Sequence, residues 1–150
     1  MALTRFAVAP CDRLRSVGVM RSLFLLTALL AASPAGAAQL TVPMGETLMF
    51  RLERGQPTHA RKANPATKPR PGEIRVSVRS MMGTTMTMTN NSRFDYAYRA
   101  TLVMPSGKLG AAKACAVPAN GRVAIEQWTR PIAAVRLDHF KRAPAGSLCP

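Results

Sequence analysis

Short runs in which apolar and polar residues alternate recur from residue 39 onward, and this pattern limits the fold more than any other feature. In the run 74–79, for example, Ile74, Val76 and Val78 alternate with arginine and serine. Since successive side chains of a strand point to opposite faces, a period of two predicts a strand with one buried face. We predict about eight strands, over residues 39–42, 47–52, 74–79, 85–89, 94–104, 109–117, 123–128 and 132–140.

Turn-forming residues separate these runs. Pro105 and Gly107 suit a turn because proline presets φ and glycine relieves it, and Asn120-Gly121 is a strong hairpin signal. Only the run 132–140 could also be read as two helical turns. Short strands joined by turns predict an all-β fold, a single small antiparallel β-sandwich. Within that class an immunoglobulin-like topology is the first expectation, on frequency alone.

Residues 20–37 have the build of a secretory signal peptide. A basic start precedes the apolar run 23–32, and small residues end the segment at Ala37, where we expect the cut. The apolar run is well short of the roughly 20 residues that a membrane-spanning helix needs. Because residues 1–19 precede a signal that is already complete, we favour Met20 as the true start of translation. Residues 1–37 are therefore a signal-peptide region.

The rest of the chain, residues 38–150, has the length of one domain and carries most of the positive charge. It holds 17 of the 21 Lys and Arg and 6 of the 7 Asp and Glu, so its net charge is +11. An exported protein meets lipid headgroups and acidic glycans before it meets nucleic acid, so we expect an anionic envelope component as partner and no nucleic acid. The alternative is a solvated basic surface without a specific partner.

The segment 53–72 breaks the alternation and combines prolines with basic residues. Its four prolines exclude a helix or a central strand, and its charges repel one another. We predict a long extended loop that contacts the anionic partner, with a plain tether as the alternative. The predicted anion-binding residues are Arg54, Arg61, Lys62, Lys68 and Arg70.

Cysteine usage agrees with export. Cys11 lies ahead of the signal, which leaves Cys115 and Cys149 as the only pair in the domain. Two cysteines in a small exported domain predict a disulfide, which would stabilise the fold by about 3–4 kcal/mol in the chain-entropy model. A metal site or a catalytic thiol is the alternative, but neither cysteine lies in a C-x-x-C motif or near a histidine.

Residues that could carry catalysis are sparse. The chain has two histidines, His59 and His139, and no Gly-x-Ser-x-Gly motif. Most of the six acids of the domain fall at strand ends or beside an arginine, where a surface ion is the ordinary explanation. We therefore predict no enzyme activity and no catalytic residue, and a small hydrolase is the least favoured alternative.

Methionines are unusually frequent, with seven of the nine after residue 37. Met86 and Met88 fall on one face of a predicted strand, and thioethers bind Cu(I). A Met-rich periplasmic copper-handling protein is therefore the main alternative function. The simpler explanation is that these side chains fill the core, since methionine packs irregular gaps well.

The sequence thus predicts a non-enzymatic exported module with a binding or accessory role at the cell envelope. We expect it in the periplasm or secreted, without a cofactor or bound metal, and not spanning the membrane once processed. Its expected partner is an anionic envelope component, either a lipid headgroup or an acidic glycan, or another exported protein.

Overall fold

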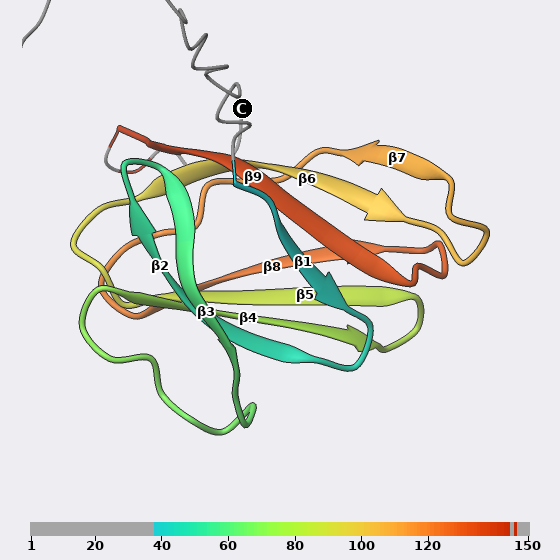
Figure 1. Cartoon of the computed structure of the whole chain (residues 1–150), viewed down its shortest axis with the longest axis horizontal. Helices are drawn as coiled ribbons and strands as arrows, with labels where there is room; N and C mark the ends of the chain where they lie inside the picture. Colours follow the sequence, from blue (N-terminus) through green and yellow to red (C-terminus); the bar gives the residue numbers. More distant parts are fainter. Residues whose placement is uncertain (1–37, 145, 147–150) are drawn as a thin grey trace, which may run out of the picture. The chain divides into compact units, whose positions relative to one another are not determined.

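The computed structural model describes residues 38–144 and residue 146, and between 38 and 144 it contains nine strands and no helix (Figure 1). In that part of the chain, accordingly, no helix is long and apolar enough to cross a membrane. The predicted signal peptide, its cut and Cys149 lie outside the described residues. The strands are β1 (Leu40–Pro43), β2 (Thr47–Glu53), β3 (Gln56–Lys62), β4 (Glu73–Ser80), β5 (Thr84–Asn90), β6 (Tyr96–Val103), β7 (Leu109–Ala112), β8 (Arg122–Trp128) and β9 (Ala134–Arg142).

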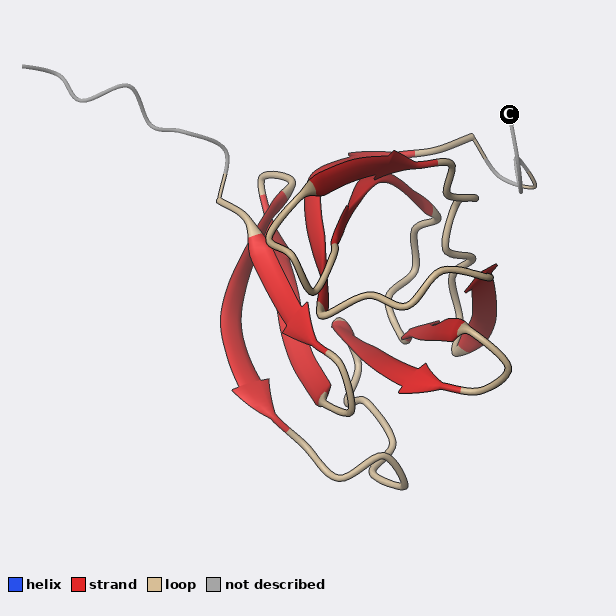
Figure 2. Ribbon diagram, turned by 90° about the vertical axis from the view of Figure 1, so that its right-hand side faces the viewer, coloured by secondary structure: helices blue, strands red, loops and turns tan. Residues whose placement is uncertain are grey.

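The strands form two antiparallel sheets, which confirms the predicted all-β class. The four-stranded sheet has the order β1-β9-β6-β7, and the five-stranded sheet has the order β3-β2-β4-β5-β8. The chain changes sheet between β1 and β2, between β5 and β6, between β7 and β8, and between β8 and β9. Figure 2 shows the two sheets curving around a shared interior.

A strand of the structure lies at each of the eight predicted runs. The aromatic run 94–104 forms β6, which lies between β9 and β7 and so has the expected central position. The helical alternative for 132–140 is wrong, because β9 pairs along its length with β1 and β6. The weak run 109–117 is shorter than predicted: only Leu109–Ala112 is a strand, and Val117 adds an isolated bridge to Tyr96.

One strand was missed, because the predicted loop over 53–72 is wrong between residues 56 and 62. That stretch is β3, which pairs with β2 at the edge of the five-stranded sheet. An edge position tolerates Pro57, and the half-exposed to exposed side chains of β3 leave no apolar alternation to detect. Arg54 and Gly55, with φ of 51° and 78°, form the tight turn that joins the two strands. Only residues 63–72 remain as a loop.

The inner faces of the two sheets share one apolar core. Phe50, Val76 and Met86 from the five-stranded sheet lie in the same buried cluster as Ala100 and Leu137 from the four-stranded sheet. The core also contains a short aromatic stack, in which the ring centroids of Phe50 and Tyr98 lie 5.6 Å and 5.7 Å from that of Phe140.

The strand ends gather into two groups, which we name for their side chains. The "cationic end" comprises the β2–β3 turn and residues 70–72, 91–95, 117–122 and 141–144, on the left of Figure 1. The "methionine end" comprises the turns at 44–46, 81–83, 104–108 and 129–133, on the right. Loop 63–72 runs from the methionine end back to the cationic end.

Candidate functional site

Three of the six acids after residue 37 are buried, and each accepts hydrogen bonds from several donors. Glu73, Asp95 and Asp138 are only 7%, 8% and 6% exposed. Each also pairs with one arginine, at 2.9, 3.5 and 2.8 Å respectively. Because these carboxylates lie inside while most Lys and Arg side chains lie outside, the surface of the domain is more strongly positive than its composition alone implies.

Glu73 begins β4 and ties the end of loop 63–72 to β3. Its two carboxylate oxygens accept from one guanidinium nitrogen of Arg61 at 2.9 and 3.1 Å, and one of them accepts from the Arg70 backbone N–H at 3.0 Å. The pKa of Glu73 lies below its usual value chiefly because of the Arg70 hydrogen bond, which together with Arg61 outweighs the opposing effect of burial.

Asp95 and Asn90 fix the loops of the cationic end. The carboxylate of Asp95 accepts from the backbone N–H of Ala119 at 2.6 Å and of Gly146 at 3.2 Å, and these bonds, Ala119 first, lower its pKa. The fully buried Asn90 amide donates to the Phe94 carbonyl at 2.8 Å, and its oxygen accepts from a backbone N–H two residues on. Buried polar groups with satisfied partners restrict a loop to one conformation.

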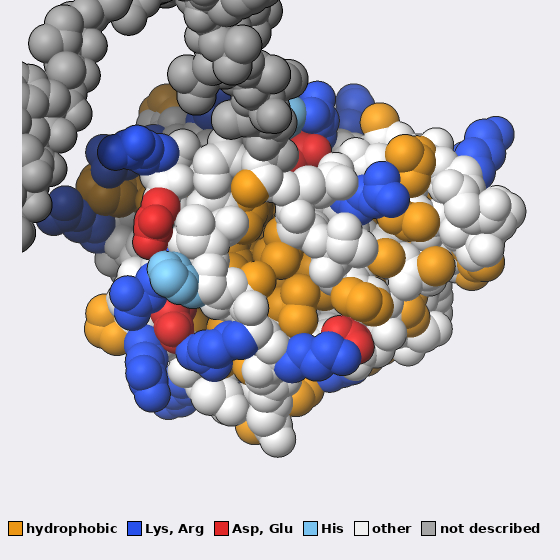
Figure 3. Space-filling model, viewed as in Figure 1, with side chains coloured by type: hydrophobic (Ala, Val, Ile, Leu, Met, Phe, Trp, Pro, Cys, Tyr) orange, Lys and Arg blue, Asp and Glu red, His pale blue; other side chains and the backbone are white. Residues whose placement is uncertain are grey.

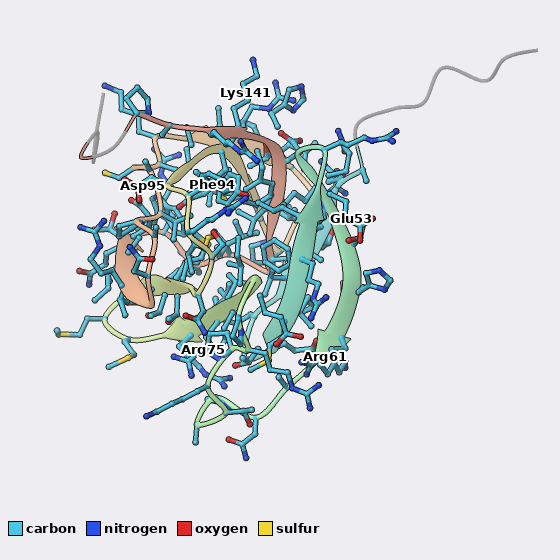
Figure 4. All side chains as sticks on the ribbon, turned by 90° about the vertical axis from the view of Figure 1, so that its left-hand side faces the viewer. Glu53, Arg61, Arg75, Phe94, Asp95 and Lys141 are labelled. Carbon is cyan, nitrogen blue, oxygen red and sulfur yellow. The ribbon has the colours of Figure 1, made fainter. Side chains whose placement is uncertain are left out.

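The cationic end carries exposed basic side chains from segments that are far apart in the sequence. Figure 3 shows Lys and Arg gathered on the left, at this end, and along the lower edge of the domain. Figure 4 looks onto the end itself, where Phe94 and Asp95 lie beside each other below Lys141. The exposed basic residues of the end are Arg54, Arg70, Arg93, Arg122, Lys141 and Arg142, of which Arg122 pairs with Asp95 at 3.5 Å.

A hollow of about 510 Å³ opens at this end around Phe94. The guanidinium carbon of Arg142 lies 3.7 Å from the centroid of the Phe94 ring, and that of Arg93 lies 4.8 Å from it. The other lining residues are apolar or neutral polar, and they include Tyr96 and Asn120. No acidic side chain of the described residues lines the hollow, so an anion there meets positive charge without a competing carboxylate.

The five predicted anion-binding residues do not form one site. Carboxylates already occupy two of them, since Arg61 pairs with Glu73 and Lys62 with Glu46 at 2.6 Å. Arg54 and Arg70 lie exposed at the cationic end, and Lys68 projects from the loop. We missed Arg93, Phe94 and Arg142, which come together only through the pairing of β6 with β9, where Tyr96 opposes Arg142.

Loop 63–72 is held against the outer face of the five-stranded sheet. Arg75 of β4 donates to the carbonyls of Pro65 and Thr67 at 2.6 and 2.9 Å, and Asn91 donates to the carbonyl of Pro69 at 2.8 Å. A hollow of about 390 Å³ lies between the loop and the sheet, with Lys68 among its lining residues. These bonds fix the loop in place, which a plain tether does not require.

A second polar cluster lies away from the cationic end, where β9 bulges against β6. Asp138 accepts from Arg99 Nε at 2.8 Å, and its other neighbours are His139 Nδ1 at 2.7 Å and Gln39. Burial raises the pKa of Asp138, but the hydrogen bonds from these three side chains outweigh it and leave the pKa below its usual value. His139 contacts Arg99 and Asp138, and His59 contacts Glu53 at 3.4 Å.

The methionines divide between the core and the methionine end. Met86 and Met88 are fully buried, whereas Met81 and Met82 are exposed in the β4–β5 turn. Met44 and Met104 lie at the same end but line two separate hollows. Within residues 38–144, no group of three or more His, Cys, Asp or Glu side chains could hold a metal ion.

Cys115 lies in the irregular segment after β7, where its backbone N–H donates to Glu126 at 2.7 Å. Its predicted bond to Cys149 stays a prediction because Cys149 lies outside the described residues.

Comparison of the chain with protein-family models, with curated proteins and with solved structures found no match in any of the three. The geometry and charge of the domain are therefore the basis for inferring its function.

Proposed function

We propose that this protein is a non-enzymatic exported module with a binding or accessory role at the cell envelope, and that its cationic end binds an anionic envelope component. The observation that carries this proposal is the separation of charge. Half of the acids of the domain are buried in bonds that fix loops and strands, while six exposed basic residues lie at one end, one of which, Arg122, pairs with Asp95. A surface with one sign of charge attracts polyanions and raises their local concentration.

Export to the periplasm or the exterior is part of the proposal and is supported by the signal-like segment 20–37. An immunoglobulin-like topology is a finer statement than two antiparallel sheets, and it stays a prediction. So does the disulfide between Cys115 and Cys149, which would hold the chain's last residues to the segment after β7.

The test compares two pairs of substitutions with equal charge change. Arg93→Ser with Lys141→Ser removes one Arg and one Lys from the cationic end, and Arg130→Ser with Lys108→Ser does the same at the methionine end. All four side chains are exposed. We expect the first pair to weaken binding to a soluble acidic polysaccharide at least tenfold at physiological salt, and the second pair to weaken it less than threefold. Equal losses would mean that only net charge matters, and no binding by the wild type at low salt would refute the proposal.

Copper handling remains a second candidate because four methionines lie at one end of the domain. Thioethers favour Cu(I), and the two exposed ones, Met81 and Met82, are accessible to it. Competition for Cu(I) against a chromogenic chelator, with wild type and with Met81→Leu/Met82→Leu, tests this candidate. Copper handling requires that the wild type binds Cu(I) and that the double variant does not.

A further inference from the structure

We propose that the hollow around Phe94 is a binding site for one acidic sugar unit of an envelope glycan. Its anionic group would bind Arg142 and Arg93, and its ring would lie among Phe94, Tyr96 and Asn120. This inference depends on the proposed function and makes it specific, because it names the class of ligand and the side chains that select it. The volume of about 510 Å³ is within the range of small-molecule sites.

The two arginines are positioned before any ligand arrives. The Arg142 guanidinium lies 3.7 Å from the Phe94 ring centroid, a distance at which a cation is attracted to the face of the ring. A guanidinium that is stacked in this way still presents its N–H donors at its edge, where a carboxylate or phosphate can accept two of them. Immobilising a free arginine side chain costs conformational entropy and so opposes binding. Because Arg142 is already held against Phe94, this arrangement favours recognition of an anion by two fixed N–H donors over attraction to a mobile charge.

The backbone of Phe94 is held by two part-buried hydrogen bonds to its carbonyl oxygen. Its carbonyl accepts from the Asn90 amide at 2.8 Å and from the Ser92 hydroxyl at 3.1 Å. Asn90 is completely buried, and next to Phe94 the Asp95 carboxylate holds the backbone of Ala119 at 2.6 Å. The backbone that carries the Phe94 ring is therefore held by the same hydrogen-bond network that holds the loops of the cationic end.

The remaining lining suits the rest of a sugar. Because Arg142 and Arg93 lie over the Phe94 ring, Tyr96 is the ring of the lining that offers apolar surface for the C–H face of a pyranose. Asn120, held at a φ of 60° next to Gly121, adds an amide that can donate to and accept from hydroxyl groups. A site made of an aromatic face, an amide and a planar cation matches a ligand that has an apolar ring face, hydroxyls and one anionic group.

A lipid surface fits this end less well than a glycan does. Peripheral proteins hold a bilayer by inserting exposed apolar side chains beside their basic residues. Here Phe94 and Tyr96 are half-buried in a hollow, and the most exposed large apolar residue, Met82 at 95%, lies at the methionine end. Two further exposed apolar residues, Val123 and Ile125, lie on β8, on the outer face of the five-stranded sheet and outside the hollow around Phe94.

The experiment titrates the full exported protein with tetragalacturonic acid, with its neutral methyl ester, with a phosphorylated monosaccharide and with vesicles that contain anionic lipid. The informative variant is Arg142→Lys, which keeps the charge but removes the planar fork. Arg130→Lys at the methionine end is the matched control. Thermal unfolding of each variant checks that it folds.

We expect Arg142→Lys to weaken binding of the acidic oligosaccharide at least tenfold and to leave the salt-dependent attraction to the vesicles as it was. The control variant Arg130→Lys should bind the oligosaccharide as the wild type does. If the phosphorylated sugar binds more tightly than the acidic oligosaccharide and loses the same affinity in Arg142→Lys, the site is supported with phosphate as its anion. Equal affinity of wild type and Arg142→Lys, equal binding of the neutral ester, or binding to vesicles alone would overturn the inference.

The two proposals fail differently. Loss of binding in Arg93→Ser/Lys141→Ser together with unchanged binding in Arg142→Lys would refute the sugar site and leave the proposed function standing. Absence of binding to every polyanion by the wild type would refute both.

Discussion

The two ends of the domain are built in different ways. At the methionine end the turns are closed chiefly by backbone hydrogen bonds, such as Met81 N–H to the Gly83 carbonyl at 3.0 Å and Gly107 N–H to the Met104 carbonyl at 2.8 Å. One buried hydroxyl, that of Thr84, adds a bond to the Arg130 carbonyl at 3.1 Å. At the cationic end, by contrast, the loops converge on buried polar side chains, Asn90 and Asp95 among them. A turn needs only its own backbone to form, so the buried network indicates that the conformation of the cationic end is specified for something beyond chain reversal.

The largest effect should come from removing the centre of that network. Asn90→Leu removes the acceptor of the Ser92 N–H and leaves the Phe94 carbonyl with the Ser92 hydroxyl as its remaining donor, and a buried group that loses its partner costs about 1–3 kcal/mol. We expect the free energy of unfolding to fall by about 1–3 kcal/mol in urea denaturation. At the other end, Met82→Ser changes an exposed turn residue and should stay within about 0.5 kcal/mol of wild type. Similar losses for the two variants would remove the distinction between the ends.

Acid should destabilise the domain through its three buried carboxylates, two of which, Glu73 and Asp95, anchor the cationic end. The pKa of Glu73 and of Asp95 is lower in the folded protein than the usual value, so each carboxylate adds stability above pH 4 that is lost as the pH falls through the folded pKa. We expect the melting temperature to fall steeply below pH 4 in wild type and less steeply in Asp95→Asn. Glu53→Gln, at an exposed carboxylate, is the control. An unchanged slope in Asp95→Asn would contradict the role of this anchor.

Tyr98 gives the opposite test, because its hydroxyl lies in the core and has no hydrogen-bond partner among the described residues. Burial raises the pKa of Tyr98. Removing an unsatisfied polar atom at constant shape relieves its desolvation, so Tyr98→Phe should raise the free energy of unfolding by about 1 kcal/mol. Thermal or urea unfolding decides the sign. A loss of stability would show that the hydroxyl has a partner after all.

Loop 63–72 should contribute least. Lys68 and Arg70 are exposed, but neither lies within the hollow around Phe94. We expect Lys68→Ser/Arg70→Ser to weaken polysaccharide binding about twofold to threefold through the general field, and this loss should vanish at high salt. A loss as large as that of Arg93→Ser/Lys141→Ser would restore the loop as the main site.

Much of the fold was accessible from the sequence because it depends on local alternation. The eight strands whose apolar and polar residues alternate, or which are bounded by turn signals, were located, whereas β3, which has neither an apolar alternation nor a buried residue, was not. The aromatic content of β6 correctly indicated a central strand. A strand that lacks a buried face is formed only through its hydrogen bonds to a neighbouring strand. No local sequence pattern shows which segment that neighbour is.

The candidate site was less accessible, because charge density along the chain is not charge density in space. The most basic segment proved to contain Arg61 and Lys62, both of which are paired with carboxylates. The stack of Arg142 on Phe94 depends on the register in which Tyr96 faces Arg142, which no local pattern specifies.

The most direct test of the account is a map of where a polyanion binds. Backbone amide chemical shifts of the exported protein, recorded during titration with tetragalacturonic acid, report on both ends in one experiment. The account predicts shifts concentrated at residues 91–95, 118–122 and 141–144, with little change at 81–83 and 104–108, and weaker binding as salt rises. Shifts spread evenly over the domain, or centred on the methionine end, would contradict it.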